Sequence, residues 1–262
     1  MLPDGVILVS FGVADEAARR QSIDAIFGDM KEAFAPQAMR QAFTSNFIRK
    51  RLAARGEIVP SLDEALDAFH LEGKRRVLVQ PTHLTAGEEY EKKICAAIRA
   101  HETQFDALVL GATLLESEVD YARLLEVLAR EMPLRAGQEL VLMGHGSPHQ
   151  HNPVYERLQA YLDAAGAQIH VGVLEESDTP SFSDVLERLQ ARGVHKIVLA
   201  PLLLSGGSHV LDDMAGEAED SWKSRFARAG IGVSPIRKGL GEYAAIRRMY
   251  VKKAQRAWER ET

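Results

Sequence analysis

The chain has 262 residues, of which 46% are hydrophobic and 26% charged, and its formal net charge at pH 7 is −5. This composition is typical of a globular protein, and the acidic balance excludes a generally basic nucleic-acid binder. A single cysteine, Cys95, excludes a disulfide framework and a cluster of thiolate metal ligands. No apolar run approaches the roughly 18 residues that a membrane span requires, and no basic segment precedes the first apolar run, so we expect a cytoplasmic protein without a signal peptide.

Short apolar runs typical of buried strands alternate with longer amphipathic segments along the whole chain. Apolar residues at helical spacing predict a helix over 14–34. Residues 152–153 and Ser181 are typical of helix starts, and Gly193 and Gly230 of helix ends. Strands separated by helices predict an α/β fold whose parallel sheets are covered on both faces. The strands are predicted over 6–11, 38–43, 76–80, 107–111, 139–143, 168–174, 196–200 and 231–236.

Two segments of the first half of the chain recur in the second. The sequence VILVSFG at 6–12 resembles LVLMGHG at 140–146, and VQPTHLTAGEEY at 79–90 resembles LAPLLLSGGSHV at 199–210. This repeat favours two related four-stranded halves over a single eight-stranded barrel.

A proline and a glycine, Pro133 and Gly137, break the helical pattern between the two halves. We therefore expect an N-terminal half over 1–135 and a C-terminal half over 136–262. The C-terminal half carries most of the candidate site residues. Whether the last helix packs back on the N-terminal half stays open.

Histidines gather after the predicted strand at 139–143. In open parallel sheets, ligands lie beyond the carboxyl ends of the strands. His145 stands between two glycines at such an end, where the backbone can turn tightly and leave the imidazole uncrowded, so we predict a functional residue rather than a buried structural one. His149 and His151 follow at a helix start and are predicted to be surface or capping residues.

Two further strand ends offer a histidine and a carboxylate. His209 lies in a glycine-rich turn after the strand at 196–200, and Glu175 follows the strand at 168–174. Together with His145 these groups would suit a borderline divalent metal, which accepts neutral imidazoles and carboxylates. Each of them could instead serve as a proton acceptor.

The evidence for candidate site residues in the first half is weaker. The acidic run 87–91 is either a favourable charge at a helix N-terminus or part of a site, and Glu89 is favoured because it aligns with His209 in the repeat. The basic residues 49–51 form either a solvated helix face or a partner for carboxylates or phosphates. No dinucleotide fingerprint, P-loop or nucleophile elbow is present, so no nucleotide is expected.

Taken together, the motifs VSFG, FTS, QPTHLTAGEEYE, LMGHGSPHQHNPVY, VGVLE, DMAGEAEDSWK and KGLGE resemble, in this order, the anaerobic cobalt chelatases, the sirohydrochlorin cobaltochelatases of early-insertion cobalamin biosynthesis. The resemblance implies a chelatase-like fold of two similar Rossmann-like halves, each a four-stranded parallel sheet flanked by helices, with the active site in the cleft between them. It also implies that the protein inserts Co²⁺, as a substrate metal, into sirohydrochlorin without ATP. The implied partners are the tetrapyrrole, the divalent metal and other copies of the chain in a homo-oligomer, with no nucleic acid and no membrane.

The same resemblance assigns roles to individual residues. It makes His145, His209 and Glu89 catalytic, and His145, Glu175 and His209 metal ligands. Their positions at strand ends, rather than the resemblance, make Ser10, Gly12, Thr44, Ser45 and His83 substrate-binding candidates, and Lys238 is a candidate for a basic rim that would face the carboxylates of the substrate. The family usually has an acidic residue where this chain has Ser208, and its absence would remove one influence that favours the imidazolium form of His209. Insertion of Fe²⁺ for siroheme, a broad divalent-metal chelatase and a non-catalytic tetrapyrrole or metal carrier remain the alternatives.

Overall fold

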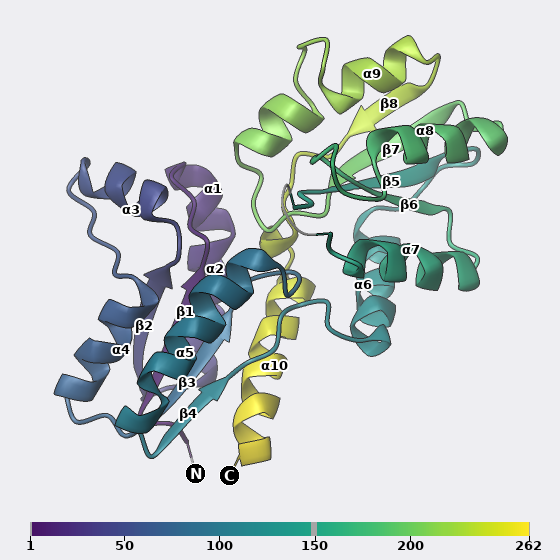
Figure 1. The fold of residues 1–262 in the computed structure, drawn as a ribbon. Coiled ribbons are helices and arrows are strands. Elements are labelled where there is room, and N and C mark those ends of the chain that lie inside the picture. Colours follow the sequence, from purple (N-terminus) through teal and green to yellow (C-terminus); the bar gives the residue numbers. More distant parts are fainter. Residues whose placement is uncertain (1, 148–150, 262) are drawn as a thin grey trace. The chain divides into compact units, whose positions relative to one another are not determined.

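A computed structural model describes residues 2–147 and 151–261 of the chain, which forms two compact units (Figure 1). The first unit is Met1–Glu116 together with Gly241–Thr262, and the second is Ser117–Leu240. The division expected at 135 and 136 therefore falls inside the second unit. The reason is that helix α6 (Glu118–Glu131), which precedes it, packs against α7 (Val154–Ala164).

Within the described residues, the strands form two four-stranded sheets in which every neighbouring pair is parallel. Their orders are β2-β1-β3-β4 and β6-β5-β7-β8, so the second sheet repeats the topology of the first. This confirms the predicted α/β fold and the two related halves. The strands are β1 (Gly5–Ser10), β2 (Ala38–Phe43), β3 (Arg76–Pro81), β4 (Ala107–Leu110), β5 (Glu139–Gly144), β6 (Ile169–Val173), β7 (Lys196–Pro201) and β8 (Gly232–Pro235).

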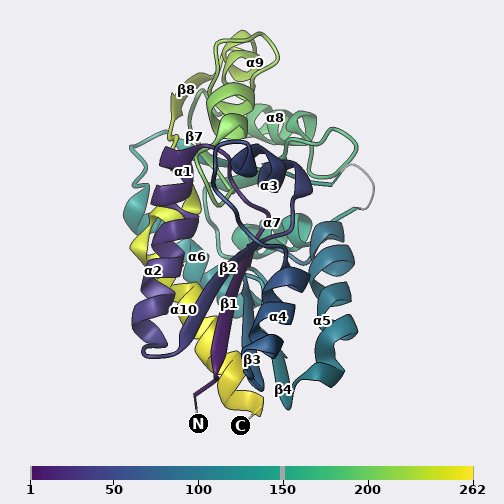
Figure 2. The ribbon, with the colours of Figure 1, turned by 90° about the vertical axis from the view of Figure 1, so that its left-hand side faces the viewer.

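Helices cover both faces of the first sheet, as Figure 2 shows. Ile7 and Val9 face α4 and pack with Phe69, while α2 and α10 lie on the other face. The hydroxyl of Tyr250 on α10 donates to the carbonyl of Thr82 at 2.7 Å, which fixes this last helix to the first unit. The helices are α1 (Glu16–Gln21), α2 (Ile23–Ala33), α3 (Asn46–Ala53), α4 (Leu62–Leu71), the π-helix η1 (Tyr90–Cys95), α5 (Ala96–His101), the 3-10 helices η2 (Glu102–Gln104) and η4 (Leu240–Glu242), and α10 (Ala244–Glu261).

The single helix predicted over 14–34 is two helices in the structure. The backbone leaves helical geometry at Ser22, between α1 and α2, and the Ser22 hydroxyl donates to the carbonyl of Ala18 at 2.5 Å. A side-chain hydroxyl that bonds back to the preceding turn competes with the helical ladder and bends it.

The second unit buries its sheet in the same manner, with α8 and α9 on one face. Trp222 is 1% exposed and packs against the rings of Phe182 and Phe226, with centroid distances of 5.3 and 6.0 Å. The helix start predicted at Ser181 is confirmed by a capping box with Asp184. Besides α6 and α7, the helices are α8 (Phe182–Ala191), the π-helix η3 (His209–Met214) and α9 (Trp222–Arg228).

The repeat extends to individual backbone hydrogen bonds at the carboxyl ends of the strands. The amide of Ser45 donates to the carbonyl of Phe11 at 3.1 Å, and the amide of Glu175 donates to the carbonyl of His145 at 3.0 Å. A π-helix follows β3 in the first unit and β7 in the second. Equivalent positions in the two units therefore carry different chemistry, with Phe11 in the place of His145.

None of the helices that the structure describes is both long enough and apolar enough to cross a membrane.

Candidate active site

His145 follows β5 directly, between two glycines that the packing requires. A Cβ on Gly144 would lie 2.5 Å from the Tyr155 ring, and one on Gly146 would lie 2.9 Å from Cβ of Val173. Gly146 also has a φ of +78°, a backbone conformation that favours glycine. The glycines therefore bring the turn against its neighbours, which is a different reason from the uncrowded imidazole expected from the sequence.

His209 is the first residue of the π-helix η3, and its ring meets that of His145. The two ring centroids are 5.0 Å apart and the planes are nearly perpendicular, at 87°. Short π-helices are often found at functional sites. Residues 64 positions apart in the sequence thus present two imidazoles at one edge of the second sheet, as the strand-end argument predicted.

In each of the two imidazoles, Nδ1 is the atom that makes a hydrogen bond. Nδ1 of His209 lies 2.7 Å from the Oδ2 atom of Asp213, and Nδ1 of His145 lies 3.1 Å from the carbonyl oxygen of Gly146. A carboxylate and a carbonyl only accept hydrogen bonds, so Nδ1 is the donor in each ring. In a neutral imidazole, Nε2 then keeps its lone pair, which is the form that binds a metal or accepts a proton.

Asp213 was not among the residues that the sequence predicted for the site. From Ser208 we expected no carboxylate next to His209, but Asp213, four residues after His209, supplies one in the structure. Residues four apart lie on one helix face, so this spacing was the available signal.

Glu175 is joined to His145 through the backbone, and Cβ of Glu175 would lie 3.1 Å from a Cβ added to Gly146. Its carboxylate is not gathered with the two imidazoles. Within residues 2–147 and 151–261, no three His, Cys, Asp or Glu side chains form a group that could hold a metal ion. The structure thus brings together two of the three predicted ligands and places the backbone of the third beside them.

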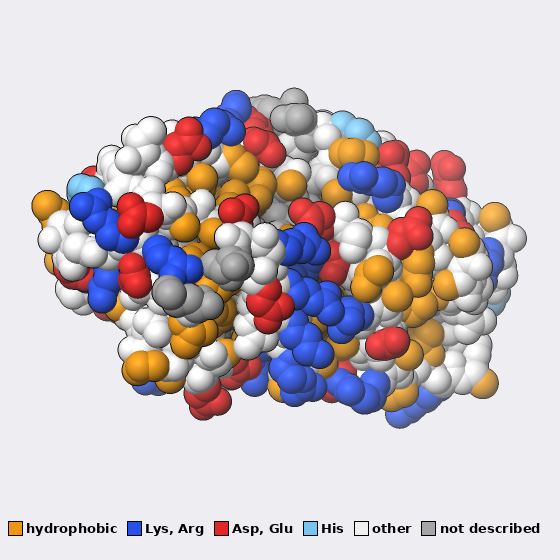
Figure 3. All heavy atoms as spheres, turned by 90° about the horizontal axis from the view of Figure 1, so that it is seen from below, with side chains coloured by type: hydrophobic (Ala, Val, Ile, Leu, Met, Phe, Trp, Pro, Cys, Tyr) orange, Lys and Arg blue, Asp and Glu red, His pale blue; other side chains and the backbone are white. Residues whose placement is uncertain are grey.

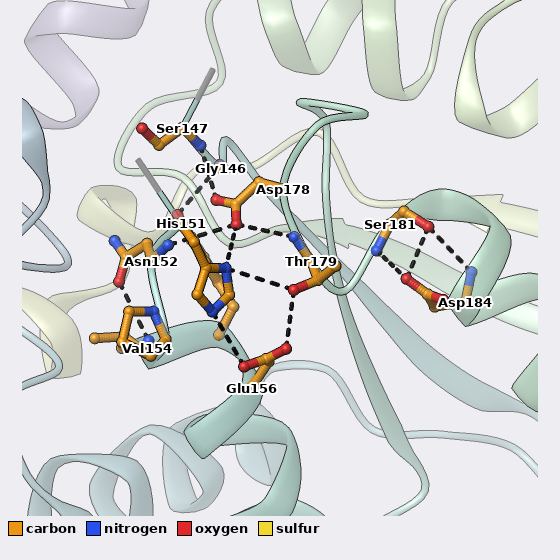
Figure 4. A network of polar contacts seen from close by, with 12 residues as sticks. Gly146, Ser147, His151, Asn152, Val154, Glu156, Asp178, Thr179, Ser181 and Asp184 are labelled. Atoms are coloured by element: carbon orange, nitrogen blue, oxygen red, sulfur yellow. Dashed lines mark hydrogen bonds and ion pairs between the residues drawn. The ribbon is translucent and has the colours of Figure 1, made fainter. Parts of the chain in front are cut away.

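A polar network adjoins these residues (Figure 4). The Asp178 carboxylate, which has no exposed side-chain area, accepts from His151 Nδ1 at 2.7 Å and from the amide of Ser147 at 2.9 Å. This hydrogen bond to Asp178 raises the pKa of His151 above its usual range. His151 is half-exposed, in line with a surface residue, and His149 lies outside the described residues.

In the first unit, Glu89 lies at the start of the π-helix η1. Among the described residues, its carboxylate makes no hydrogen bond or ion pair, whereas that of Glu88 pairs with Lys92 one turn later. Glu91, the third carboxylate of the acidic run, makes a side-chain hydrogen bond with Cys95. Glu88 and Glu91 therefore have partners on their own helix, whereas Glu89 is available for chemistry.

Most of the other predicted residues of the first unit lie beneath the surface. Ser10, Thr44 and Ser45 are at most 8% exposed, and the Ser45 hydroxyl caps α3 by accepting from the amide of Ile48. A Cβ on Gly12 would lie 2.8 Å from the Phe43 ring.

His83 is buried at both ring nitrogens. Among the described residues, neither nitrogen has a hydrogen-bond partner, and the ring packs edge-on against Tyr90 with centroids 6.3 Å apart. Burial lowers the pKa of His83 to about 4. The ring is therefore neutral near pH 7 and offers no positive charge to a carboxylate.

The basic residues suggested by the sequence have varied surroundings. The Arg49 guanidinium donates to the carbonyl of Val59 at 3.0 Å and pairs with Glu64, so it stabilises its own unit. Lys238 is exposed in the segment after β8. Lys and Arg side chains also gather near the middle of the face seen from below (Figure 3). That face is at the opposite end of the first sheet from Ser10.

Comparison with known proteins identifies the family to which this chain belongs. The sequence profile of the cobalt chelatase (CbiK) family matches residues 4–259. The sirohydrochlorin cobaltochelatase of Salmonella typhimurium is 35% identical over 248 residues, which cover 94% of this chain and 93% of that protein. The sirohydrochlorin cobaltochelatase CbiKC of Nitratidesulfovibrio vulgaris is 33% identical over 248 residues, covering 93% of this chain and 86% of the other.

A solved structure shares the fold. SirB from Bacillus subtilis with Fe³⁺ superposes with a TM-score of 0.66 at 14% identity, over 99% of this chain and 98% of that one. The family profile and the two relatives cover nearly the whole chain, and they show that it belongs to the cobalt chelatase (CbiK) family and is a metal chelatase that handles cobalt.

Proposed function

We propose that this chain inserts Co²⁺ into sirohydrochlorin without ATP. The two curated relatives are named as sirohydrochlorin cobaltochelatases and match almost end to end. The observation that carries the proposal is the pair of imidazoles, His145 and His209, whose Nδ1 atoms are each held by an acceptor while Nε2 stays open.

Open nitrogens on two adjacent rings suit a metal that must be bound and then released. Divalent first-row metals lie about 2.0–2.1 Å from an imidazole nitrogen, so two rings with centroids 5.0 Å apart are close enough to share one ion. Two protein ligands leave coordination positions open for the nitrogens of the macrocycle. We propose Glu175 as a third ligand, and binding then includes movement of its carboxylate toward the imidazoles.

Insertion also releases two pyrrole protons from the macrocycle for each Co²⁺ that enters. A positioned base contributes a factor of about 10² to 10⁴ to such a step. We propose Glu89 as one acceptor, because its carboxylate has no other partner in the described part of the chain. His145 and His209 are the other candidates, since each has an open Nε2.

The test is an anaerobic absorbance assay with sirohydrochlorin and, in parallel, Co²⁺, Fe²⁺, Ni²⁺ and Zn²⁺. We expect repeated turnover with Co²⁺. Faster insertion of Fe²⁺ would favour the siroheme reaction, and saturation at one equivalent of tetrapyrrole would indicate a carrier. The predicted homo-oligomer and cytoplasmic location stay predictions.

Variants of the two histidines test the residue roles. His145→Ala and His209→Ala should each lower the insertion rate by at least about tenfold, because each loses a ligand that is fixed at Nδ1. His195→Ala is the matched control, since His195 is an exposed histidine of the same unit at the opposite end of β7. Normal turnover by either active-site variant would remove that histidine from the mechanism.

A further inference from the structure

One buried carboxylate lies behind the candidate site and is not part of it. The Asp178 side chain has no exposed area. A buried carboxylate is costly unless its oxygens are fully hydrogen-bonded. Asp178 accepts from the amides of Ser147 at 2.9 Å, Thr179 at 2.9 Å and Asn152 at 3.4 Å, and from His151 at 2.7 Å.

These donors come from the two segments that carry proposed metal ligands. Ser147 is two residues after His145, and Asp178 is three residues after Glu175. The amide of Asp178 donates to the carbonyl of Glu175, and the amide of Glu175 donates to the carbonyl of His145, both at 3.0 Å. The side chain and backbone of Asp178 therefore fasten the turn after β5 to the turn after β6.

A second set of hydrogen bonds joins these two turns to α7. His151 lies between two carboxylates, with Nδ1 at 2.7 Å from Asp178 and Nε2 at 3.2 Å from Glu156 (Figure 4). The hydroxyl of Thr179 donates to Glu156 at 2.9 Å. Glu156 is in the first turn of α7, so the two turns are attached to a regular helix as well as to the sheet.

We infer that Asp178 is a positioning residue for cobalt insertion, which acts by holding His145 and Glu175 in one fixed arrangement. The inference rests on the proposed function, because it acts through the ligands proposed there. Groups that orient metal ligands typically change metal affinity or activity by about 10- to 100-fold when they are replaced. Asp178 differs from such groups because it bonds to the two backbone segments that carry the ligands, at Ser147 and at Glu175.

Asp178→Asn tests the inference at constant side-chain size. Asparagine has one acceptor oxygen, whereas the carboxylate of Asp178 has two. Its NH₂ group then faces either the amide of Ser147 or Nδ1 of His151, and the hydrogen bond at that position is lost. The matched control is Asp184→Asn, which removes a carboxylate from the capping box with Ser181 six residues later. Asp184 makes no hydrogen bond to the turn after β5 within the described residues.

The measurements are the Kd for Co²⁺ alone, the kcat and KM of insertion, and the thermal unfolding midpoint. We expect Asp178→Asn to weaken Co²⁺ binding and lower kcat by about tenfold or more, while Asp184→Asn changes both by less than about twofold. Equal effects of the two variants on Co²⁺ binding would overturn the inference. If Asp178→Asn does not fold, His151→Gln is the alternative variant, because His151 is half-exposed and contacts Asp178. We expect it also to weaken Co²⁺ binding and lower kcat.

A double-mutant cycle separates this inference from the proposed function. If Asp178 acts through His145 and Glu175, then Asp178→Asn should add almost no further loss in a background that carries both His145→Ala and Glu175→Ala. A full additional loss in that background would overturn the positioning role alone. Unchanged Co²⁺ binding by His145→Ala itself would overturn the metal assignment and, with it, the route proposed for Asp178.

Discussion

Replacing Asp213 by asparagine tests whether the carboxylate beside His209 strengthens metal binding at the proposed site. The substitution keeps a side chain of the same size and one acceptor oxygen near Nδ1 of His209, but it removes the negative charge. A metal bound at Nε2 makes the imidazole more positive, and a carboxylate at Nδ1 stabilises that state. Co²⁺ binding should therefore weaken without any change of fold.

The size of the effect follows from the exposure of the pair. A hydrogen bond to a charged group contributes about 1.5–3 kcal/mol when it is shielded, whereas exposed ion pairs contribute about 0–1 kcal/mol. The side chains of His209 and Asp213 are 50% and 43% exposed, and their atoms lie 2.7 Å apart. An intermediate value of about 1 kcal/mol corresponds to a roughly fivefold weaker Kd for Co²⁺.

Titration of Co²⁺ by calorimetry or by its visible absorbance measures this Kd. Asp212→Asn is the control, because it removes the neighbouring charge while leaving the hydrogen bond of Asp213 in place. Equal changes for the two variants would show that net charge alone matters. An unchanged Kd for Asp213→Asn would refute the argument that the second carboxylate supports the metal ligand.

Three further predictions concern other parts of the site. Glu89→Gln should lower kcat by about 10²-fold or more, as expected for loss of a proton acceptor, with Glu88→Gln as the control in the same insertion assay. Gly146→Ala should lower the free energy of unfolding in urea by at least about 1–2 kcal/mol, because its φ of +78° is strained for alanine. Asp178 raises the pKa of His151, so their pair stabilises fully below about pH 6.5 and is lost as pH rises through that raised pKa. The difference in Tm between the wild type and His151→Gln should therefore narrow in alkaline buffer, and a widening gap would contradict it.

The strands were predictable because their signal is local. Each is a short apolar run between turn residues, and the observed ends differ from the predicted ones by about one residue. The break at Ser22 was not predictable in this way, because apolar residues continue at helical spacing through it. The boundary between the units also depends on packing, since α6 belongs to the second unit through its contact with α7.

Some residues of the candidate site were likewise predictable from the sequence, and others were not. The meeting of His145 and His209 followed from the rule that parallel strands place their carboxyl ends at one edge of the sheet. The role of Asp213 was within reach of sequence reasoning, since it is four residues from His209. The role of Asp178 could not be predicted from the sequence. Its donors Ser147 and His151 are 31 and 27 residues away and contact it only in the folded chain.

The internal duplication leaves the two units with unequal chemistry at matching positions. Phe11 replaces His145, and Ser45 replaces Glu175, at the equivalent backbone hydrogen bonds of the first unit. All three proposed ligands consequently originate from a single copy of the repeat. If the proposed ligands are correct, capture of the ion depends on side chains of the second unit, Ser117–Leu240, while the first unit contributes different residues at the matching positions.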